Sequence, residues 1–391
     1  MTKKLLIVIP RFEIGGTNTS LINWCAVLDR DRYQIDIFSM SHSGPLKESF
    51  SNINILPQDK LMSSMITNLG AQNGFFNTIL SIITKSMINI GSFINIDFSN
   101  KINRRVAKKL STLKYDTVIA FQEGVATKLV SNIKSVNKIG IIRCNYQNYL
   151  QIGGSKPEIK EYSTYKSIIT VSRYTGSVFC DIIPEYRKKT FAIHNIIDDK
   201  RIIKLASEKI DSSEFPTDCF TIVSVGRIDP VKRFDQIPKI AKELKYKTNS
   251  KFRWYIVGGG SQIAIDKIKS LAKDYGVEDC VVCLGQKLNP YPYIVASDLV
   301  AITSISEACP NILNEAKILG VPPLATDFGS ACEFIDTKRS GFISPIEEIP
   351  SLLASILNGE SEYDKIKNNL SKFKYCNCEI VKQIYEILES K

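Results

Sequence analysis

The stretch FTIVSVGRIDPVK, residues 220–232, joins a short apolar run to a basic turn. A run of this kind, rich in Val and Ile, is typical of a strand buried on both faces of a parallel sheet. It leads directly into Gly226 and Arg227, and Lys232 follows closely. Ligands of doubly wound α/β sheets bind at the carboxyl ends of the strands. The stretch therefore predicts a parallel α/β fold with two cations placed where an anion can bind, although a solvated basic turn would explain it equally if it stood alone.

Similar apolar runs recur along the chain, separated by segments of helical length. They lie at residues 5–9, 35–39, 117–121, 139–143, 168–171, 191–194, 254–257, 281–284, 299–302, 323–326 and 341–344. We therefore expect an α/β protein with two Rossmann-like, doubly wound parallel-sheet domains that face each other across a cleft. The predicted boundaries are a first domain at 1–195, a polar hinge at 196–218, a second domain at 219–375, and a helix at 376–391 that returns toward the first domain.

The overall composition limits the class of protein without choosing the function. The chain has 391 residues and a formal charge of +11, which suits nucleic acid, anionic lipid or phosphorylated substrates. Its N-terminal apolar run ends at Pro10 and predicts a first strand, not a signal peptide. No run approaches the roughly 20 apolar residues of a spanning helix, so a cytoplasmic protein is expected. The ten cysteines are mostly scattered through apolar runs, and the two histidines form no ligand cluster, so no metal site is predicted.

Glycines follow the second strand of the C-terminal half. Gly258, Gly259 and Gly260 come directly after the predicted strand at 254–257. Glycines at such a position let the backbone approach a ligand closely. A tight turn between strand and helix explains them nearly as well.

The segment SEACPNILNEAKILG, residues 306–320, carries two carboxylates and a predicted helix start. Pro310 suits the first helical turn and Gly320 a C-terminal cap, so a helix is expected from about Pro310 to Leu319. The backbone N–H groups near its start would point at an anion or a sugar hydroxyl. Glu307 precedes this helix and Glu315 lies one turn inside it, so the pair is placed to hold two parts of one ligand bearing vicinal diols. An ordinary capping or surface role is the alternative for Glu315.

Together these segments resemble the retaining family 4 glycosyltransferases of the GT-B fold. The resemblance is carried by four motifs in order: G-R-x4-K (Gly226, Arg227, Lys232), G-G-G (258–260), L-G-x3-N-P-Y (Leu284, Gly285, Asn289, Pro290, Tyr291) and S-E-x2-P-N-x3-E-A (306–316). In the N-terminal half it is thinner and rests on Gly15-Gly16 and on residues 121–124. Each motif is weak by itself, but four in register are specific.

The resemblance implies a role for each matching residue. Arg227, Lys232 and Glu307 form the catalytic set, in which the two cations bind the donor diphosphate and Glu307 the transferred sugar. Glu315 holds the ribose, while Gly16, Gly258, Gly259 and the backbone of Asn311, Ile312 and Leu313 complete the donor site. Glu123, Asn145 and Tyr146 are the expected sugar or acceptor pocket, where Asn145 stands in place of a histidine common in the family. No metal or other cofactor is implied.

The implied reaction is transfer of a hexose or N-acetylhexosamine from a nucleotide diphosphate sugar, with uridine diphosphate favoured. The implied acceptor is a glycan, carried by a polyprenyl diphosphate, in surface-polysaccharide synthesis. The alternative is a nucleotide-sugar epimerase or hydrolase of the same fold, whose histidine-rich cleft has little support in a chain with two histidines. Nucleic-acid binding is a remote alternative, because no platform of interleaved aromatic and basic residues accompanies the positive charge.

A second amphipathic feature lies in the N-terminal half. Apolar residues recur at helical spacing over residues 75–96, and a basic cluster follows immediately. The stripe is Phe76, Ile79, Leu80, Ile83, Met87, Ile90 and Ile94, and the cluster contains Lys101, Arg104, Arg105, Lys108 and Lys109. An apolar stripe beside cations can lie on an anionic bilayer, so a peripheral position on the cytoplasmic face of the membrane is predicted, with Arg104, Arg105, Lys108 and Lys109 as docking residues. The alternative is a helix packed on the sheet, followed by a solvated basic helix.

Overall fold

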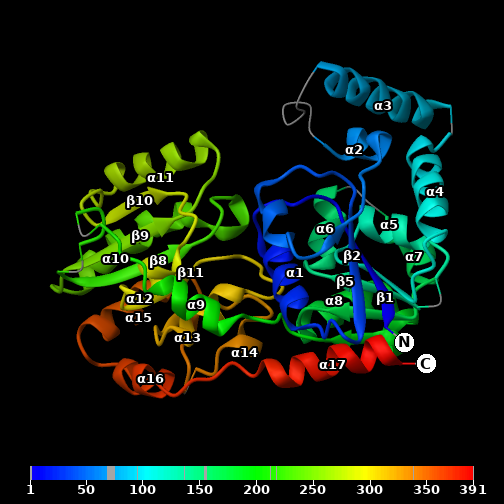
Figure 1. The fold of residues 1–391 in the computed structure, drawn as a ribbon. Helices are drawn as coiled ribbons and strands as arrows, with labels where there is room; N and C mark the ends of the chain where they lie inside the picture. Colours follow the sequence, from blue (N-terminus) through cyan, green and yellow to red (C-terminus); the bar gives the residue numbers. More distant parts are fainter. Residues whose placement is uncertain are drawn as a thin grey trace. The chain divides into compact units, whose positions relative to one another are not determined.

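The protein folds into two compact α/β units in the computed structural model (Figure 1). The structure describes residues 2–67, 75–94, 96–135, 137–153, 156–211, 213–216, 218–337 and 339–390. Unit 1 comprises residues 1–196 and 377–391, and unit 2 comprises residues 197–376. Among the described residues, no helix combines the length and the apolar character needed to cross a bilayer.

Unit 1 is built on a parallel sheet of seven strands in the order β3-β2-β1-β4-β5-β6-β7. The strands are β1 (Lys3–Ile9), β2 (Tyr33–Ser39), β3 (Asn54–Ile55), β4 (Thr117–Ala120), β5 (Asn137–Ile142), β6 (Ser167–Thr170) and β7 (Thr190–Ala192). The helices are α1 (Gly16–Val27), α2 (Lys60–Ile66), α3 (Phe75–Phe93), α4 (Phe98–Ser111), α5 (Val125–Ser131), α6 (Tyr146–Gly153), α7 (Ile159–Tyr162), α8 (Arg173–Ile182) and α17 (Asn377–Glu389). The residues 5–9 of β1 are all buried, as expected of a central strand covered on both faces.

Unit 2 is built on a parallel sheet of six strands in the order β10-β9-β8-β11-β12-β13. Its strands are β8 (Phe220–Val225), β9 (Phe252–Val257), β10 (Val281–Gly285), β11 (Leu299–Ile302), β12 (Pro323–Thr326) and β13 (Phe342–Ser344). Its helices are α9 (Asp199–Ala206), α10 (Ile237–Lys247), α11 (Gln262–Asp274), α12 (Tyr291–Val295), α13 (Asn311–Ile318), α14 (Ala331–Phe334), α15 (Ile349–Leu357) and α16 (Tyr363–Leu370). Helices cover both faces of the sheet, and each face has its own apolar core (Figure 1).

The strand orders place one topological switch point in each sheet. In unit 1 the chain builds outward from β1 in one direction and then restarts with β4 on its other side. In unit 2 the same reversal occurs between β8 and β11. Loops that leave the carboxyl ends of two such neighbouring strands part in opposite directions and open a crevice, which is where ligands bind in this class of fold. The loops after β1, β4, β8 and β11 are therefore the places to look for a site.

The predicted fold of two parallel α/β sheets is confirmed. The predicted hinge at 196–218 contains helix α9, which is counted within unit 2 and packs beside α12 and α13. Residues 212 and 217 of that segment lie outside the described residues. Helix α17 is part of unit 1, where the Tyr385 ring stacks on Tyr33 and the Tyr385 hydroxyl accepts a hydrogen bond from the Asp29 amide at 2.8 Å.

Candidate active site

The loop after β8 is a tight turn held by Asp229. The Asp229 carboxylate accepts hydrogen bonds from the amides of Val231 and Lys232 at 3.1 and 3.2 Å, and so caps the short 3₁₀ turn at Pro230–Lys232. Arg227 extends from the same loop, with 82% of its side chain exposed and its guanidinium 3.5 Å from Asp229. Because the guanidinium is open to solvent, it is accessible to an anionic ligand at the strand's end.

Lys232 and Glu307 meet across the switch point of unit 2. The Lys232 ammonium lies 2.5 Å from Glu307 Oε1, and both side chains are largely shielded from solvent. Ser304, which follows β11, donates to the same Oε1 at 2.7 Å. The two loops are also joined by their backbones, since the Ile305 amide donates to the Val231 carbonyl at 2.8 Å. A cation from the β8 loop and a carboxylate from the β11 loop are thus fixed together where this fold binds ligands.

Glu315 lies in helix α13 and is half-buried. Burial raises the pKa of its carboxyl to about 7, although the Tyr291 hydroxyl, 3.5 Å from Oε1, and the positive charge of Arg201 both act to lower that pKa. An acid whose pKa is shifted this far changes its charge near neutral pH, and such groups are concentrated at functional sites.

Asn289 and Tyr291 of the N-P-Y motif, and Arg201, form the surroundings of Glu315. Asn289 donates to the Leu205 carbonyl of α9 at 2.8 Å and accepts from the Tyr291 amide at 3.2 Å. The N-P-Y motif therefore fixes α12 against α9 and places the Tyr291 hydroxyl at Glu315. The sequence did not single out Arg201, because α9 lies in the segment interpreted as a hinge. Two signals could have revealed this helix. The Asp198 side chain caps α9 by accepting a hydrogen bond from the Arg201 amide at 2.9 Å, and the apolar residues of the segment recur at helical spacing.

Helix α13 begins at Asn311 and ends at Ile318, close to the predicted bounds. Its first turn contains a local hydrogen bond, because the Leu313 amide donates to the Pro310 carbonyl at 3.1 Å. That amide is already used within the protein, so the expected contribution of the Leu313 backbone to ligand binding is not supported by this geometry. The amides of Asn311 and Ile312 come before the Leu313 amide in the same first turn of α13, and for them the expectation of a ligand contact stands.

The glycines after β9 serve close packing of two backbone segments. A Cβ atom on Gly258 would lie 1.7 Å from the Gly226 carbonyl oxygen, and one on Gly260 would lie 2.7 Å from the Ile228 carbonyl oxygen. The Ile228 amide donates to the Gly259 carbonyl at 2.8 Å, which ties the Arg227 loop to the end of β9. The close approach inferred from these glycines is therefore an approach to the neighbouring loop, and it holds the backbone on either side of Arg227 in place.

This packing gives a stability prediction. Gly258→Ala should lower the free energy of unfolding by about 3 kcal/mol or more, because the new methyl group overlaps a backbone atom that cannot rotate away. Urea unfolding followed by intrinsic fluorescence measures the loss. Gly259→Ala is the matched control, since its nearest neighbours are atoms of the flexible Gln286 side chain. Equal stability of the two variants would contradict the packing argument.

In unit 1, the loop after β4 and the loop after β5 are joined through Glu123. Its carboxylate accepts from the Arg143 amide at 2.8 Å. The Arg143 guanidinium bridges three segments, with bonds to the Phe121 carbonyl at 3.0 Å, to Asn195 Oδ1 at 2.9 Å and to Ser20 Oγ at 3.0 Å. Glu123 therefore follows the carboxyl end of β4, beside the switch point of this sheet.

Asn145 and Tyr146, the other expected pocket residues, have structural roles. The Asn145 side chain accepts from the Asn148 amide at 3.2 Å and so acts as a cap of α6. The Tyr146 side chain is fully buried, and its hydroxyl donates to Glu158 at 2.6 Å. Tyr146 belongs to the apolar core of unit 1, contrary to the expectation that it lines a sugar pocket. The carboxylate that binds the Tyr146 hydroxyl belongs to a residue twelve positions along the chain.

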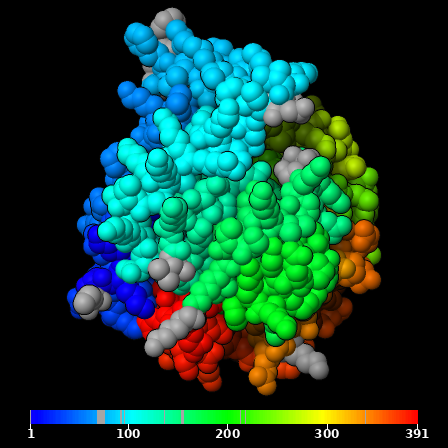
Figure 2. Space-filling model, turned by 90° about the vertical axis from the view of Figure 1, so that its right-hand side faces the viewer, coloured from blue at the N-terminus to red at the C-terminus, as the bar shows by residue number. Residues whose placement is uncertain are grey.

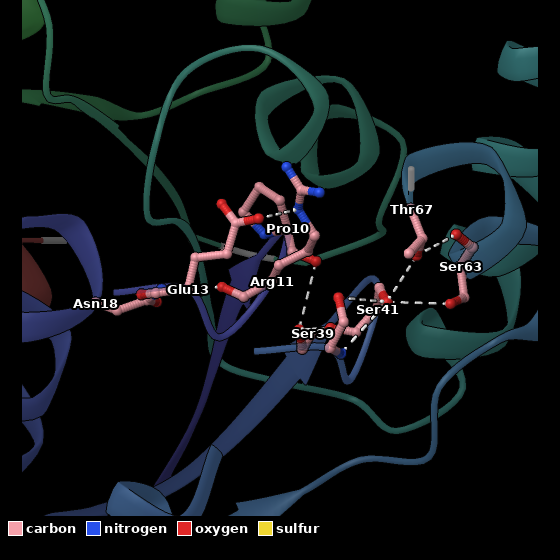
Figure 3. Close-up of polar contacts among 9 residues, drawn as sticks. Pro10, Arg11, Glu13, Asn18, Ser39, Ser41, Ser63 and Thr67 are labelled. Carbon is pink, nitrogen blue, oxygen red and sulfur yellow. Dashed lines mark hydrogen bonds and ion pairs between the residues drawn. The ribbon is translucent and has the colours of Figure 1, made fainter. Parts of the chain in front are cut away.

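A cluster of hydroxyl groups lies beside the ends of β1 and β2 (Figure 3). Ser41 Oγ is its centre and bonds to Ser43 Oγ at 3.1 Å, to Ser63 Oγ at 3.1 Å and to Thr67 Oγ1 at 2.9 Å. The loop between β1 and α1 is held by Asn18, whose side-chain amide donates to the carbonyls of Arg11 and Glu13. Gly16 begins helix α1 on the other side of this loop, and a Cβ there would meet nothing within 4 Å. The loop is therefore shaped by Asn18, and Gly16 leaves open space at its end.

The predicted docking residues lie on α4. Arg104, Arg105, Lys108 and Lys109 are all exposed. Arg105 also forms an ion pair with Asp59 at 2.5 Å, where Asp59 is the N-cap of α2. Arg105 therefore joins two helices of unit 1 in addition to adding positive charge to the surface. Among the described residues, no group of three or more His, Cys, Asp or Glu side chains is arranged to hold a metal ion.

Comparison with known proteins places this geometry in a class. The profile of the family described as "Glycosyl transferases group 1" matches residues 206–373, which lie within unit 2. HepE of Anabaena, solved in complex with UDP and glucose, superposes with a TM-score of 0.70 over 100% of both chains at 16% identity. An uncharacterized glycosyltransferase of Haemophilus influenzae is 22% identical over 89% of this chain and 88% of its own. A Campylobacter jejuni N-acetylgalactosaminyltransferase, named for a diphospho-undecaprenol-linked substrate, is 28% identical over 46% of each chain.

The fold is therefore GT-B, with two Rossmann-like parallel-sheet domains. The chain is a glycosyltransferase, and the segment matched by the group 1 profile contains the ion pair of Lys232 and Glu307 and the Glu315 carboxyl.

Proposed function

We propose that the chain is a retaining glycosyltransferase of family 4 that moves a hexose or N-acetylhexosamine from a UDP-sugar to a polyprenyl-diphosphate-linked glycan. The observation that carries the proposal is the pairing of Lys232 and Glu307 at the switch point of unit 2. This arrangement presents a cation for a diphosphate beside a carboxylate for sugar hydroxyls. UDP in the HepE complex and the lipid-linked substrate in the Campylobacter enzyme's name support the two substrates.

In the proposed reaction the site stabilises the leaving group. As the bond from the anomeric carbon to the diphosphate oxygen breaks, the sugar gains oxocarbenium character and negative charge grows on that oxygen. Arg227 and Lys232 would stabilise this charge, and no bound metal is needed for it. Glu307 would hold the transferred sugar, and Glu315 the two ribose hydroxyls. The leaving oxygen can then accept the proton of the acceptor hydroxyl, which attacks on the same face and so retains the configuration.

The acceptor side of the proposal rests on unit 1. Glu123 is the residue proposed to contact the acceptor or the sugar, because it lies at the carboxyl end of β4 beside the switch point. The exposed cations Arg104, Lys108 and Lys109 are proposed to face an anionic membrane, where a polyprenyl diphosphate would reside. The enzyme would then work as a peripheral protein on the cytoplasmic face of that membrane.

A panel of sugar nucleotides tests the proposal directly. The chain should release UDP from one UDP-hexose or UDP-N-acetylhexosamine, and a lipid-linked glycan acceptor should raise this release at least about tenfold over donor hydrolysis. Activity should persist in EDTA. Release of nucleotide at an equal rate with and without acceptor would favour a hydrolase or epimerase. Activity only with guanosine or adenosine diphosphate sugars would contradict the choice of donor.

A further inference from the structure

Helix α3 turns its apolar side chains outward. Of the twenty-one large apolar side chains that are exposed in the described part of the chain, seven lie between residues 79 and 94. They are Ile79, Ile82, Ile83, Met87, Ile90, Phe93 and Ile94. Ile90 is 58% exposed and Phe93 is 87% exposed. Successive members are mostly three or four residues apart, so they form one continuous face of the helix.

The side of α3 that packs on α2 carries buried hydroxyl groups. Ser81 and Thr84 are buried, and they bond to Ser64 of α2. Ser81 Oγ donates to the Ser64 carbonyl at 2.8 Å, and Ser64 Oγ donates to Thr84 Oγ1 at 2.9 Å. Beside them, the Lys85 ammonium donates to the Thr67 carbonyl at 2.8 Å. Helix α3 is therefore held on unit 1 by hydrogen bonds along this side.

This polarity is the reverse of an ordinary surface helix. A helix on a water-soluble domain buries its apolar stripe and exposes its polar residues, because burial of apolar area drives its docking. Figure 1 shows α3 as the outermost element of unit 1, with α2 between it and the sheet, and in Figure 2 its light-blue atoms form the outer end of that unit. The apolar face therefore points away from the core of its own unit, and an exposed patch of this kind marks an interaction site.

The charge around α3 identifies the partner. Residues 75–112 contain six lysines and arginines and one carboxylate, a net charge of +5 out of +11 for the whole chain. Three exposed cations, Arg104, Lys108 and Lys109, are on α4, which begins close to the C-terminal end of α3 and contacts it there (Figure 1). An uncharged apolar face joined at one end to a basic helix matches the boundary between the acyl chains and headgroups of an anionic bilayer.

We propose that α3 inserts its outward face into the acyl boundary of an anionic bilayer, with its axis in the plane of the membrane. The side that packs on α2 remains bonded to it, so only one side of the helix enters the lipid. The cations of α4 bind the headgroups beside it. The insertion of α3 rests on the membrane contact proposed above. In that contact the basic residues of α4 attract the anionic membrane at a distance, and α3 enters the lipid. A second copy of the chain is the competing occupant of the face.

Fluorescence of a single new tryptophan tests the insertion. The natural Trp24 and Trp254 are both buried, so their emission should not respond to vesicles. Met87→Trp places a reporter in the outward face. Its emission should shift to shorter wavelength with vesicles of phosphatidylglycerol and phosphatidylcholine, and brominated acyl chains should quench it. A control reporter, Ile263→Trp on α11, starts 84% exposed and should not respond. No shift and no quenching at position 87 would overturn the proposal.

Vesicle binding by two sets of variants separates insertion from charge. Replacing Ile83, Met87 and Ile90 with glutamine should weaken co-sedimentation about tenfold or more at every salt concentration. Replacing Arg104, Lys108 and Lys109 with glutamine should weaken it mainly at low salt, because exposed charges are screened. Thermal unfolding without lipid should be unchanged in both, since these side chains are exposed.

Two further readouts keep the outcomes distinct. Donor hydrolysis without lipid should be the same in all variants, so a failure of the proposed reaction is visible separately from a failure of docking. Light scattering over a range of protein concentrations reports on self-association. Dimers that dissociate in the triple glutamine variant, with vesicle binding unchanged, would show that a second copy covers the face and would overturn the bilayer proposal.

Discussion

Lys232→Met is expected to lower kcat for sugar transfer by about 10²- to 10³-fold while the donor still binds. Removing one preorganised group that faces the developing charge of a leaving group has an effect of this size. The loss falls on kcat because the interaction strengthens as the diphosphate oxygen becomes charged, whereas Arg227 continues to contribute to ground-state binding. Initial rates of UDP release with saturating donor and acceptor measure it. A rate within about twofold of the unmodified enzyme would contradict the assignment of Lys232.

Lys232→Met also breaks the ion pair with Glu307, so a second variant is needed to separate lost stability from lost catalysis. Without Lys232, the shielded Glu307 carboxylate loses its charged partner, which costs stability and can itself reduce activity. The double variant Lys232→Met/Glu307→Gln removes both charges and should restore the melting temperature but not the rate. Lys245→Met is the matched control, because Lys245 also pairs with a carboxylate of unit 2, Asp279 at 2.8 Å, which lies just before β10 and so at the amino ends of the strands, opposite the switch-point loops. Its rate should be unchanged.

The sequence was sufficient to predict the two parallel sheets because their strands are nearly continuous apolar runs. Residues 5–9 and 299–302 are all buried, as short apolar runs of this kind are when helices cover both faces of a sheet. The positions of Lys232 and Glu307, two residues of the proposed site in unit 2, were also predictable, since they occur in motifs that follow the ends of β8 and β11. Their pairing was not predictable. The contact of Lys232 with Glu307 joins residues 75 positions apart, and depends on the strand order that places β11 beside β8.

The predictions that failed concern side chains whose environment is set by tertiary packing. Tyr146 was placed in a pocket because the family resemblance implies one near residues 143–146, but Glu158 and the surrounding aromatic rings bury it. The stripe of α3 was recognised by its spacing, yet spacing alone does not tell which face a helix turns to its own domain. The hydrogen bonds of Ser81 and Thr84 decide that orientation, and their partner lies on another helix.

A second expected result concerns pH. The kcat/KM for the donor should fall about tenfold between pH 8 and pH 6, with a midpoint near 7, because Glu315 is proposed to bind the ribose hydroxyls as a carboxylate. Burial raises the pKa of the free enzyme's Glu315 to about 7, so the ionised fraction drops through this range. A protonated acid accepts fewer hydrogen bonds from a diol than a carboxylate does. The same shift makes the ionised form costly to fold, so its destabilising effect grows as pH rises from the ordinary value of 4.5 through 7.

Three variants decide whether Glu315 is responsible. Glu315→Gln should lower kcat/KM and remove the step near pH 7. Tyr291→Phe should move the midpoint upward, because the lost hydroxyl is one of the groups that lower the Glu315 pKa. Tyr293→Phe, on the same helix, removes a hydroxyl that donates to Glu214 at 3.2 Å and should leave the midpoint where it is. A step that survives in Glu315→Gln would assign the titration to another group, whereas a midpoint that responds to Tyr291 but not to Tyr293 would place the titrating group at Glu315.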